Sequence, residues 1–126
     1  MLVISFAMEK YYYRRLDVYQ NAKQLAIDIH ELLKCFPQDE RFALTDQLRR
    51  ASTSIMFNIA EGFGRYTDKD RIRFLDIANG SLMEVSSELE IALSFHYLTL
   101  EEFDSFDEKI LIIVRQLAKL RSTIQV

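Results

Sequence analysis

Apolar side chains recur every three or four residues along most of the chain, which is the spacing of one buried helix face. Four stretches show this pattern. The first, residues 17–36, begins at Asp17 as its N-cap and stops before Pro37, which cannot continue a helix. Its apolar positions are Val18, Ala22, Leu25, Ile29, Leu32 and Phe36. The pattern therefore predicts a first helix with one face in a core.

The second stretch, residues 43–63, is rich in small side chains. Its buried face is predicted to consist of Leu44, Leu48, Ala51, Ile55, Asn58 and Gly62. Small side chains allow a neighbouring helix to approach closely. Asn58 is the polar member of this face, and a buried amide must find hydrogen-bond partners, so it fixes the register of packing. Gly62 and Gly64 are expected to end this helix and open a turn.

The third and fourth stretches begin at recognisable N-caps. Thr67 is predicted to cap the third helix, and Thr99 with Glu102 forms a capping-box pattern before the fourth. Gly80 lies in the middle of the third helix, where glycine costs about 1 kcal/mol relative to alanine. That cost predicts a close helix crossing at Gly80. In the fourth stretch, a break near Phe106 is left open.

Four helices of roughly 20 residues joined by short turns predict an all-α fold, an antiparallel up-down four-helix bundle. We expect residues 1–16 to form an N-terminal tail and residues 17–126 to form the bundle domain. Several rings fall partly outside the four predicted faces, namely Phe57, Phe63, Tyr66, Phe74, Phe95 and Tyr97. Since a lone protomer would expose many of them, we expect a homo-oligomer.

Composition supports a small soluble domain. The 126 residues include only three Gly and one Pro, too few for a fold with many strand reversals. The net charge of −3 disfavours broad binding to phosphate backbones. The single cysteine, Cys35, is interpreted as an inert small hydrophobe and suits a reducing cytoplasm. Residues 1–7 are too short to be a signal peptide or membrane span, and Met8 is an alternative start to Met1.

No constellation of residues predicts catalysis. A di-iron bundle requires Glu-x-x-His motifs, and neither His30 nor His96 has a glutamate three residues before it. His96 is interpreted as a packed ring with one hydrogen bond. No metal site, cofactor or enzymatic activity is therefore predicted.

Two charged sets are candidates for binding. The first is a basic patch at the turn between the second and third helices, which acidic neighbours dilute: Arg65, Lys69, Arg71 and Arg73. It is either a nucleic-acid contact or a solvated surface. The second is predicted to be an interhelix or intersubunit polar network, with a ligand or RNA contact as the alternative: Arg49, Arg50, Asn58, Glu61 and Glu84.

A third candidate is the cluster of three tyrosines and two arginines at residues 11–15. Tyrosine rings beside arginines can stack on unpaired bases, as in single-strand-binding proteins. The alternative is that these rings pack on a neighbouring helix or subunit.

Three spaced motifs in the central helices resemble those of the 23S rRNA-intervening-sequence proteins, a four-helix bundle family. They read Gln47-Leu48-Arg49-Arg50-Ala51, Ser54-Ile55-x-x-Asn58-Ile59-Ala60-Glu61-Gly62 and Ala78-x-Gly80-Ser81-x-x-Glu84. The resemblance covers nearly the whole chain. It implies a ring-like homopentamer without known enzymatic activity, and some members are encoded within insertions in large-subunit ribosomal RNA genes. A distantly related branch, the accessory protein of diversity-generating retroelements, binds nucleic acid and a reverse transcriptase, and its members are strongly basic.

Two functional hypotheses follow. The leading one is a cytoplasmic, non-enzymatic oligomeric bundle that binds RNA or another nucleic acid through the basic turn. The alternative is a protein–protein interaction module without nucleic-acid binding. Neither hypothesis involves a membrane.

Overall fold

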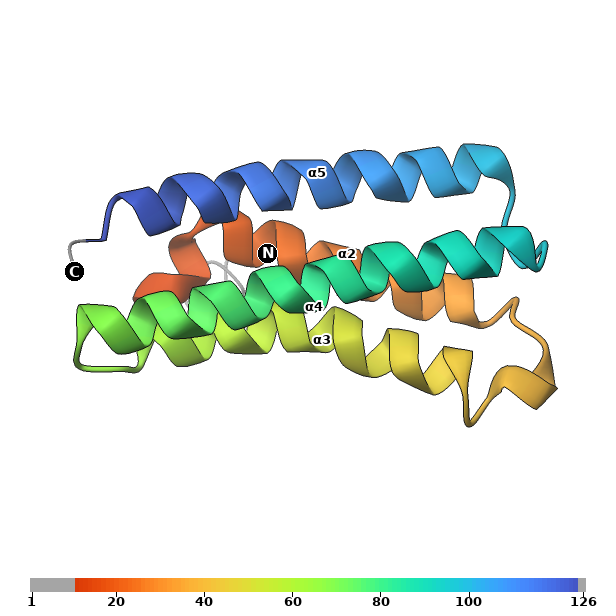
Figure 1. The fold of residues 1–126 in the computed structure, drawn as a ribbon, viewed down its shortest axis with the longest axis horizontal. Coiled ribbons are helices and arrows are strands. Elements are labelled where there is room, and N and C mark those ends of the chain that lie inside the picture. Colours follow the sequence, from red (N-terminus) through yellow and green to blue (C-terminus); the bar gives the residue numbers. More distant parts are fainter. Residues whose placement is uncertain (1–10, 125–126) are drawn as a thin grey trace, which may run out of the picture.

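The computed structural model describes residues 11–124, which form four α-helices and no strand (Figure 1). The helices are α2 (Asp17–Leu33), α3 (Leu44–Phe63), α4 (Asp68–Ser94) and α5 (Leu100–Ser122). Two short 3-10 helices accompany them: η1 (Tyr12–Arg15) precedes α2, and η2 (Gln38–Glu40) lies between α2 and α3. The predicted all-α class with four helices is confirmed. The question of Met1 or Met8 as the start falls outside the described residues.

The predicted helix faces form one hydrophobic core. Its fully buried side chains come from all four helices and include Leu25, Ile29, Leu48, Ile55, Ile59, Leu75, Leu82, Val85, Leu89 and Ile113. Asn58 is not among them. It is half-buried and donates hydrogen bonds to the backbone oxygen of Ser54 at 2.8 Å and to its Oγ at 3.0 Å. Ile59 takes the core position in place of Asn58, while the other five predicted residues of this face are buried.

The helix ends match the local capping signals in most places. Thr67 caps α4 by accepting from the Asp70 N–H, and Thr99 and Glu102 form the complete capping box of α5. One cap differs from prediction: the N-cap of α2 is Leu16 rather than Asp17, which is the first helical residue. The open question of a break near Phe106 is resolved, since α5 runs through this residue without interruption.

Helix α4 packs closely against α3 at Gly62, not at Gly80. A Cβ added at Gly62 would lie 3.3 Å from the backbone oxygen of Arg71 and 3.3 Å from the Cβ of Phe74. Gly80 is exposed, and a Cβ there would meet nothing within 4 Å. The prediction of a close crossing at Gly80 is therefore wrong within one protomer. Gly80 instead lies on an open face of α4.

The six rings predicted to be surplus fall into two groups. Phe57, Tyr66 and Phe95 are exposed, as expected. Phe74 is buried, and Phe63 and Tyr97 pack against the core. Half of the rings predicted to be surplus are therefore exposed on one protomer.

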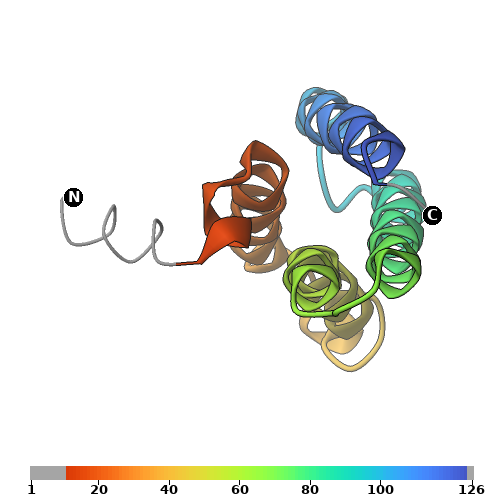
Figure 2. The same cartoon turned by 90° about the vertical axis from the view of Figure 1, so that its left-hand side faces the viewer.

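Specific polar contacts fix how the helices sit against one another. Ser54 of α3 bonds Ser81 of α4 through their hydroxyls at 2.9 Å. Between α2 and α5, Asn21 bonds Gln116 at 3.0 Å, and Asp28 bonds Lys109 at 3.0 Å. Figure 2 shows α4 lying between α3 and α5 when the bundle is viewed along its length. Among the described helices, none is long and apolar enough to cross a membrane.

Candidate nucleic-acid interface

The fold brings the tyrosine cluster and the basic turn to the same end of the bundle. The ring of Tyr12 in η1 packs on Phe63, the last residue of α3, with centroids 5.5 Å apart. The guanidinium of Arg71 lies 5.1 Å from the centroid of the same Phe63 ring. Phe63 therefore joins two segments about fifty residues apart in sequence. We call this end, residues 11–15 together with residues 63–74, the basic end.

Two of the four predicted basic residues hold the turn in shape. Arg71 donates from Nε to the Gly62 carbonyl and from Nη2 to the Arg65 carbonyl, each at 3.3 Å, and it pairs with Asp68 at 3.8 Å. Arg65 pairs with Glu61 at 3.2 Å and lies 4.5 Å from the ring centroid of Phe74. Much of their hydrogen-bonding capacity is thus used within the protomer.

The other two basic residues are available to a ligand. Lys69 and Arg73 are exposed and form no ion pair with any residue in the described range. Arg73 lies over Phe74, 5.2 Å from its centroid. Both line a shallow hollow of about 620 Å³ on α4, which also includes Ile77 and two carboxylates, Asp70 and Asp76.

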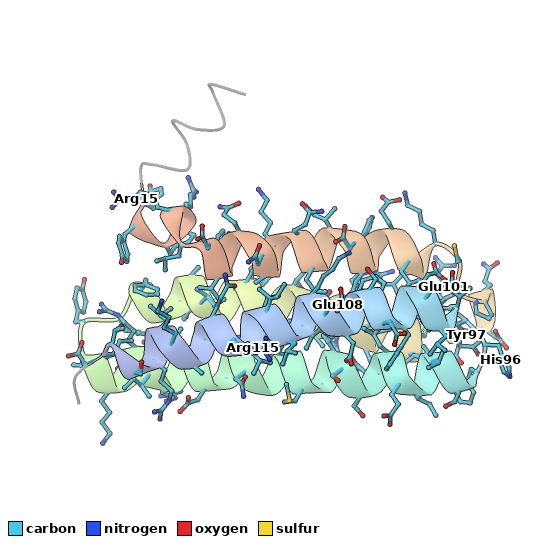
Figure 3. All side chains as sticks on the ribbon, turned by 90° about the horizontal axis from the view of Figure 1, so that it is seen from above. Arg15, His96, Tyr97, Glu101, Glu108 and Arg115 are labelled. Carbon is cyan, nitrogen blue, oxygen red and sulfur yellow. The ribbon has the colours of Figure 1, made fainter. Side chains whose placement is uncertain are left out.

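Charge is strongly separated along the bundle. The half containing the basic end, residues 11–23, 54–81 and 114–124, has ten Lys and Arg and five Asp and Glu. The other half, residues 24–53 and 82–113, has five Lys and Arg and thirteen Asp and Glu. Figure 3 shows this polarity, with Arg15 near one end and Glu101 near the other. The net charge of −3 therefore conceals one positive and one negative half, and it is a poor guide to phosphate binding here.

The second predicted set does not form a single network within the protomer. Arg49 and Arg50 both pair with Asp46, one turn earlier, at 3.9 Å and 3.6 Å. Asn58 and Glu61 also bond within α3 or its end, and Glu84 is exposed on α4. The side-chain hydrogen bond that joins the middle of α3 to α4 comes from Ser54 and Ser81, which were not predicted as members of this network although both lie in the quoted motifs.

Comparison with known proteins decides the family. Residues 14–119 match the 23S rRNA-intervening sequence protein family. The chain belongs to that family. It is also similar, at 27% identity and a TM-score of 0.77, to a solved structure of a protein of unknown function from the S23 ribosomal protein family of Bacteroides thetaiotaomicron VPI-5482. The match covers 82% of this chain and 97% of that one. No curated protein sequence matches significantly.

This intervening-sequence family member has a buried carboxyl group that the sequence did not predict. Glu88 of α4 is only 7% exposed, and its Oε1 has no hydrogen-bond partner. Burial, the nearby charge of Glu84 and a hydrogen bond with Glu84 raise the pKa of Glu88 to about 7. The helical period places Glu88 next to the apolar position Leu89, but it does not predict that the carboxyl group is buried.

Three other residues lie at the end of the bundle opposite the basic end, and their environments were not predicted. His96 is exposed rather than packed, and its backbone φ is 65°. Cys35, interpreted from the sequence as an inert small hydrophobe, is exposed too. The Tyr97 hydroxyl donates to Glu40 Oε2 at 2.7 Å, and this bond is the main reason that the pKa of Tyr97 rises to about 12.

Proposed function

We propose that this protein is a non-enzymatic, oligomeric bundle that binds RNA or another nucleic acid through its basic end, and that it works in the cytoplasm. The supporting observation is the separation of charge, which gathers the tyrosine cluster and the basic turn at one end. Lys69 and Arg73 supply cations that are not neutralised by an ion pair.

The acidic half does not oppose such binding at physiological salt. Screening reduces charge interactions strongly beyond a Debye length of about 8 Å. Helix α5 alone has 23 residues, which corresponds to about 35 Å at 1.5 Å per residue. A phosphate at the basic end is therefore governed by the charges close to it.

The test is a titration of labelled structured RNA and single strands, followed by fluorescence anisotropy at two salt concentrations. The double variant Lys69→Gln/Arg73→Gln should bind more weakly at low salt. The magnitude of its slope of log affinity against log salt should fall by about 1.4 to 1.8, because each lost phosphate contact removes about 0.7 to 0.9.

A control with the same change in net charge is available at the other end. Lys34→Gln/Arg41→Gln removes two exposed cations from the acidic half and should leave affinity nearly unchanged. Equal losses in both double variants would indicate that only net charge matters. Absence of binding by the wild-type protein at micromolar concentration would exclude the nucleic-acid function.

We extend the proposal to assembly: antiparallel bundles associate into a closed ring, with a homopentamer as the expected size. The supporting surface is the outer face formed by α3 and α4. It carries exposed Phe57, Ile77 and Ile91 around Gly80, together with charges of both signs, Arg50 and Glu84. An exposed glycine in mid-helix allows another backbone to come close, and self-complementary charges suit a second copy.

Light scattering of Gly80→Arg tests the assembly. A Cβ at Gly80 meets nothing within the protomer, so this variant should fold. It should nevertheless shift the solution mass toward that of one protomer, because the long side chain separates the copies. Ser105→Arg, at an exposed position of α5, is the control and should assemble as the wild type does. A wild-type mass of 14.9 kDa would contradict assembly outright.

A second function, a protein-binding module without nucleic-acid binding, is favoured by a different surface. Phe42 is 87% exposed beside η2, and Leu100 is exposed at the start of α5. Large apolar groups at the acidic end are suited to a protein partner. Affinity capture that retains one protein after nuclease treatment, and loses it in Phe42→Ser, would favour this function over the first.

A further inference from the structure

Tyr66 is fully exposed, at 103% of its reference area, in the short turn between α3 and α4. Cations flank it on both sides in sequence, Arg65 before it and Lys69 three residues after it. No other ring within the described residues packs against it. An exposed aromatic ring can stack on an unpaired base, and the cations on either side of it can bind the neighbouring phosphates.

Tyr12 supplies a second ring at the same end. It is 55% exposed while part of its surface packs on Phe63, so it is held in place and still open. The guanidinium of Arg15 lies 5.2 Å from its centroid. A ring that is already ordered loses little conformational entropy when a base stacks on it.

Continuous contacts connect these two rings. Tyr12 packs on Phe63, Phe63 lies under Arg71, and Arg71 donates to the carbonyl oxygen of Arg65, the residue before Tyr66. The rings and cations of the basic end thus belong to one ordered surface. Lys69 and Arg73 lie on the first turns of α4 beside it.

We infer that the ligand of the basic end is single-stranded nucleic acid, with unpaired bases stacking on Tyr66 and Tyr12 and phosphates on Lys69 and Arg73. This inference rests on the proposed nucleic-acid function and names its ligand class. Base stacking on aromatic side chains requires bases that are not already stacked in a duplex.

The carboxylates at this end also favour a single strand. Glu61, Asp68 and Asp70 lie among the cations of the turn. A rigid duplex presents closely spaced phosphates on two strands and would place some of them against these carboxylates. A flexible strand can direct its phosphates to the cations and its bases to the rings.

The experiment compares four 12-nucleotide ligands by fluorescence anisotropy: a single strand of RNA, the same strand of DNA, the corresponding duplex, and an abasic strand with the same number of phosphates. Wild-type protein should bind the single strands more tightly than the duplex. The RNA and DNA arms show whether the 2′-hydroxyl contributes.

Variants at the two rings separate stacking from charge. Tyr66→Ala should weaken single-strand binding by about 5- to 150-fold, while leaving the abasic strand unaffected. Tyr66→Phe keeps the ring and should bind as the wild type does. Tyr12→Leu preserves an apolar contact with Phe63 and should also reduce single-strand affinity. Because Tyr66 is fully exposed, its variants should melt at the wild-type temperature.

The outcomes distinguish this inference from the proposed function. If the duplex binds as tightly as the single strand, or if Tyr66→Ala binds normally, stacking is excluded. In that case a loss of binding in Lys69→Gln/Arg73→Gln would still support phosphate binding. If wild-type protein binds none of the four ligands, both the inference and the proposed function are overturned.

Discussion

His96 ends α4 in a backbone conformation that favours glycine. Its φ of 65° lies in the left-handed region, which a residue with a Cβ enters at a cost of about 1 kcal/mol. The His96 N–H donates to the Leu93 carbonyl at 2.9 Å, and the Tyr97 N–H donates to the Ala92 carbonyl at 3.0 Å. This pair of bonds is the Schellman motif that closes a helix C-terminus. The motif sets the sharp reversal into α5.

We therefore expect His96→Gly to stabilise the protein. Removing the Cβ should raise the free energy of unfolding by about 0.5 to 1 kcal/mol, or the melting temperature by a few degrees. Urea denaturation measures the difference. His30→Gly is the matched control, since His30 lies on an exposed position within α2, where glycine should destabilise. A less stable His96→Gly variant would contradict the interpretation.

Glu88 is a second residue whose environment should affect stability, in this case as a function of pH. In the unfolded chain its pKa is near 4.5, and in the folded protein it is about 7. The folded state therefore holds the proton more tightly. Glu88 contributes stability that is fully present below pH 4.5 and is lost as the pH rises through about 7.

Glu88→Gln should remove this pH dependence. The neutral amide can still donate to Glu84, so the variant should be more stable than the wild type above pH 7, by about 2 kcal/mol. Below pH 5 the advantage should vanish. Unfolding by urea between pH 4.5 and 8.5 provides the comparison, with the exposed Glu90→Gln as control. Parallel stability curves for wild type and Glu88→Gln would show that Glu88 titrates normally.

At the scale of helices, the pair α3–α4 shows which features local sequence can predict. The caps at Thr67 and Thr99 depend on residues within one turn, so the sequence identifies them correctly. The role of Gly80 depends on what packs against it. Helical periodicity shows which residues share a helix face, but it does not show which element packs on that face. Gly62 lies in the last turn of α3 and on its buried face, as predicted, and α4 packs closely against it.

The two glycines should consequently respond in opposite ways to alanine. Gly62→Ala places a Cβ 3.3 Å from backbone and side-chain atoms of α4, and it should destabilise the protein by about 1 to 3 kcal/mol. Gly80→Ala meets nothing and should stabilise by up to about 1 kcal/mol through helix propensity. Denaturation at two protein concentrations would show both effects. A loss of stability in Gly80→Ala only at the higher concentration would place a second copy over that glycine.

At the scale of the whole molecule, the dominant feature is the charge separation between the two halves. The sequence reveals only part of it: residues 82–113 contain eight Asp and Glu and a single Lys, but residues 11–23, 54–81 and 114–124 come together only when the helices fold back on one another. The basic turn could be found as a local patch, but its union with residues 11–15 depends on the contact between Tyr12 and Phe63. Arg65 and Arg71 also could not be recognised in advance as supports of the turn.

Charge changes at the acidic end should have little effect on nucleic-acid binding. Glu101→Gln/Asp104→Asn raises the net charge by two, the same amount by which Lys69→Gln/Arg73→Gln lowers it. Because these carboxylates lie at the opposite end of α5 from its C-terminus, affinity at 150 mM salt should change less than about twofold. Anisotropy titrations of both variants in parallel would measure this. A large gain in affinity of Glu101→Gln/Asp104→Asn would contradict the prediction, because it would show that charges of the acidic half act on a ligand at the basic end.

The position of Cys35 offers a practical route to these measurements. The first described element, η1, and the C-terminal end of α5 both lie toward the basic end, where a fused tag could obstruct a bound strand (Figure 1). The sole thiol of the sequence is exposed beyond the last turn of α2, at the opposite extremity. A maleimide fluorophore attached there would report on tumbling and subunit exchange while leaving the ligand surface bare.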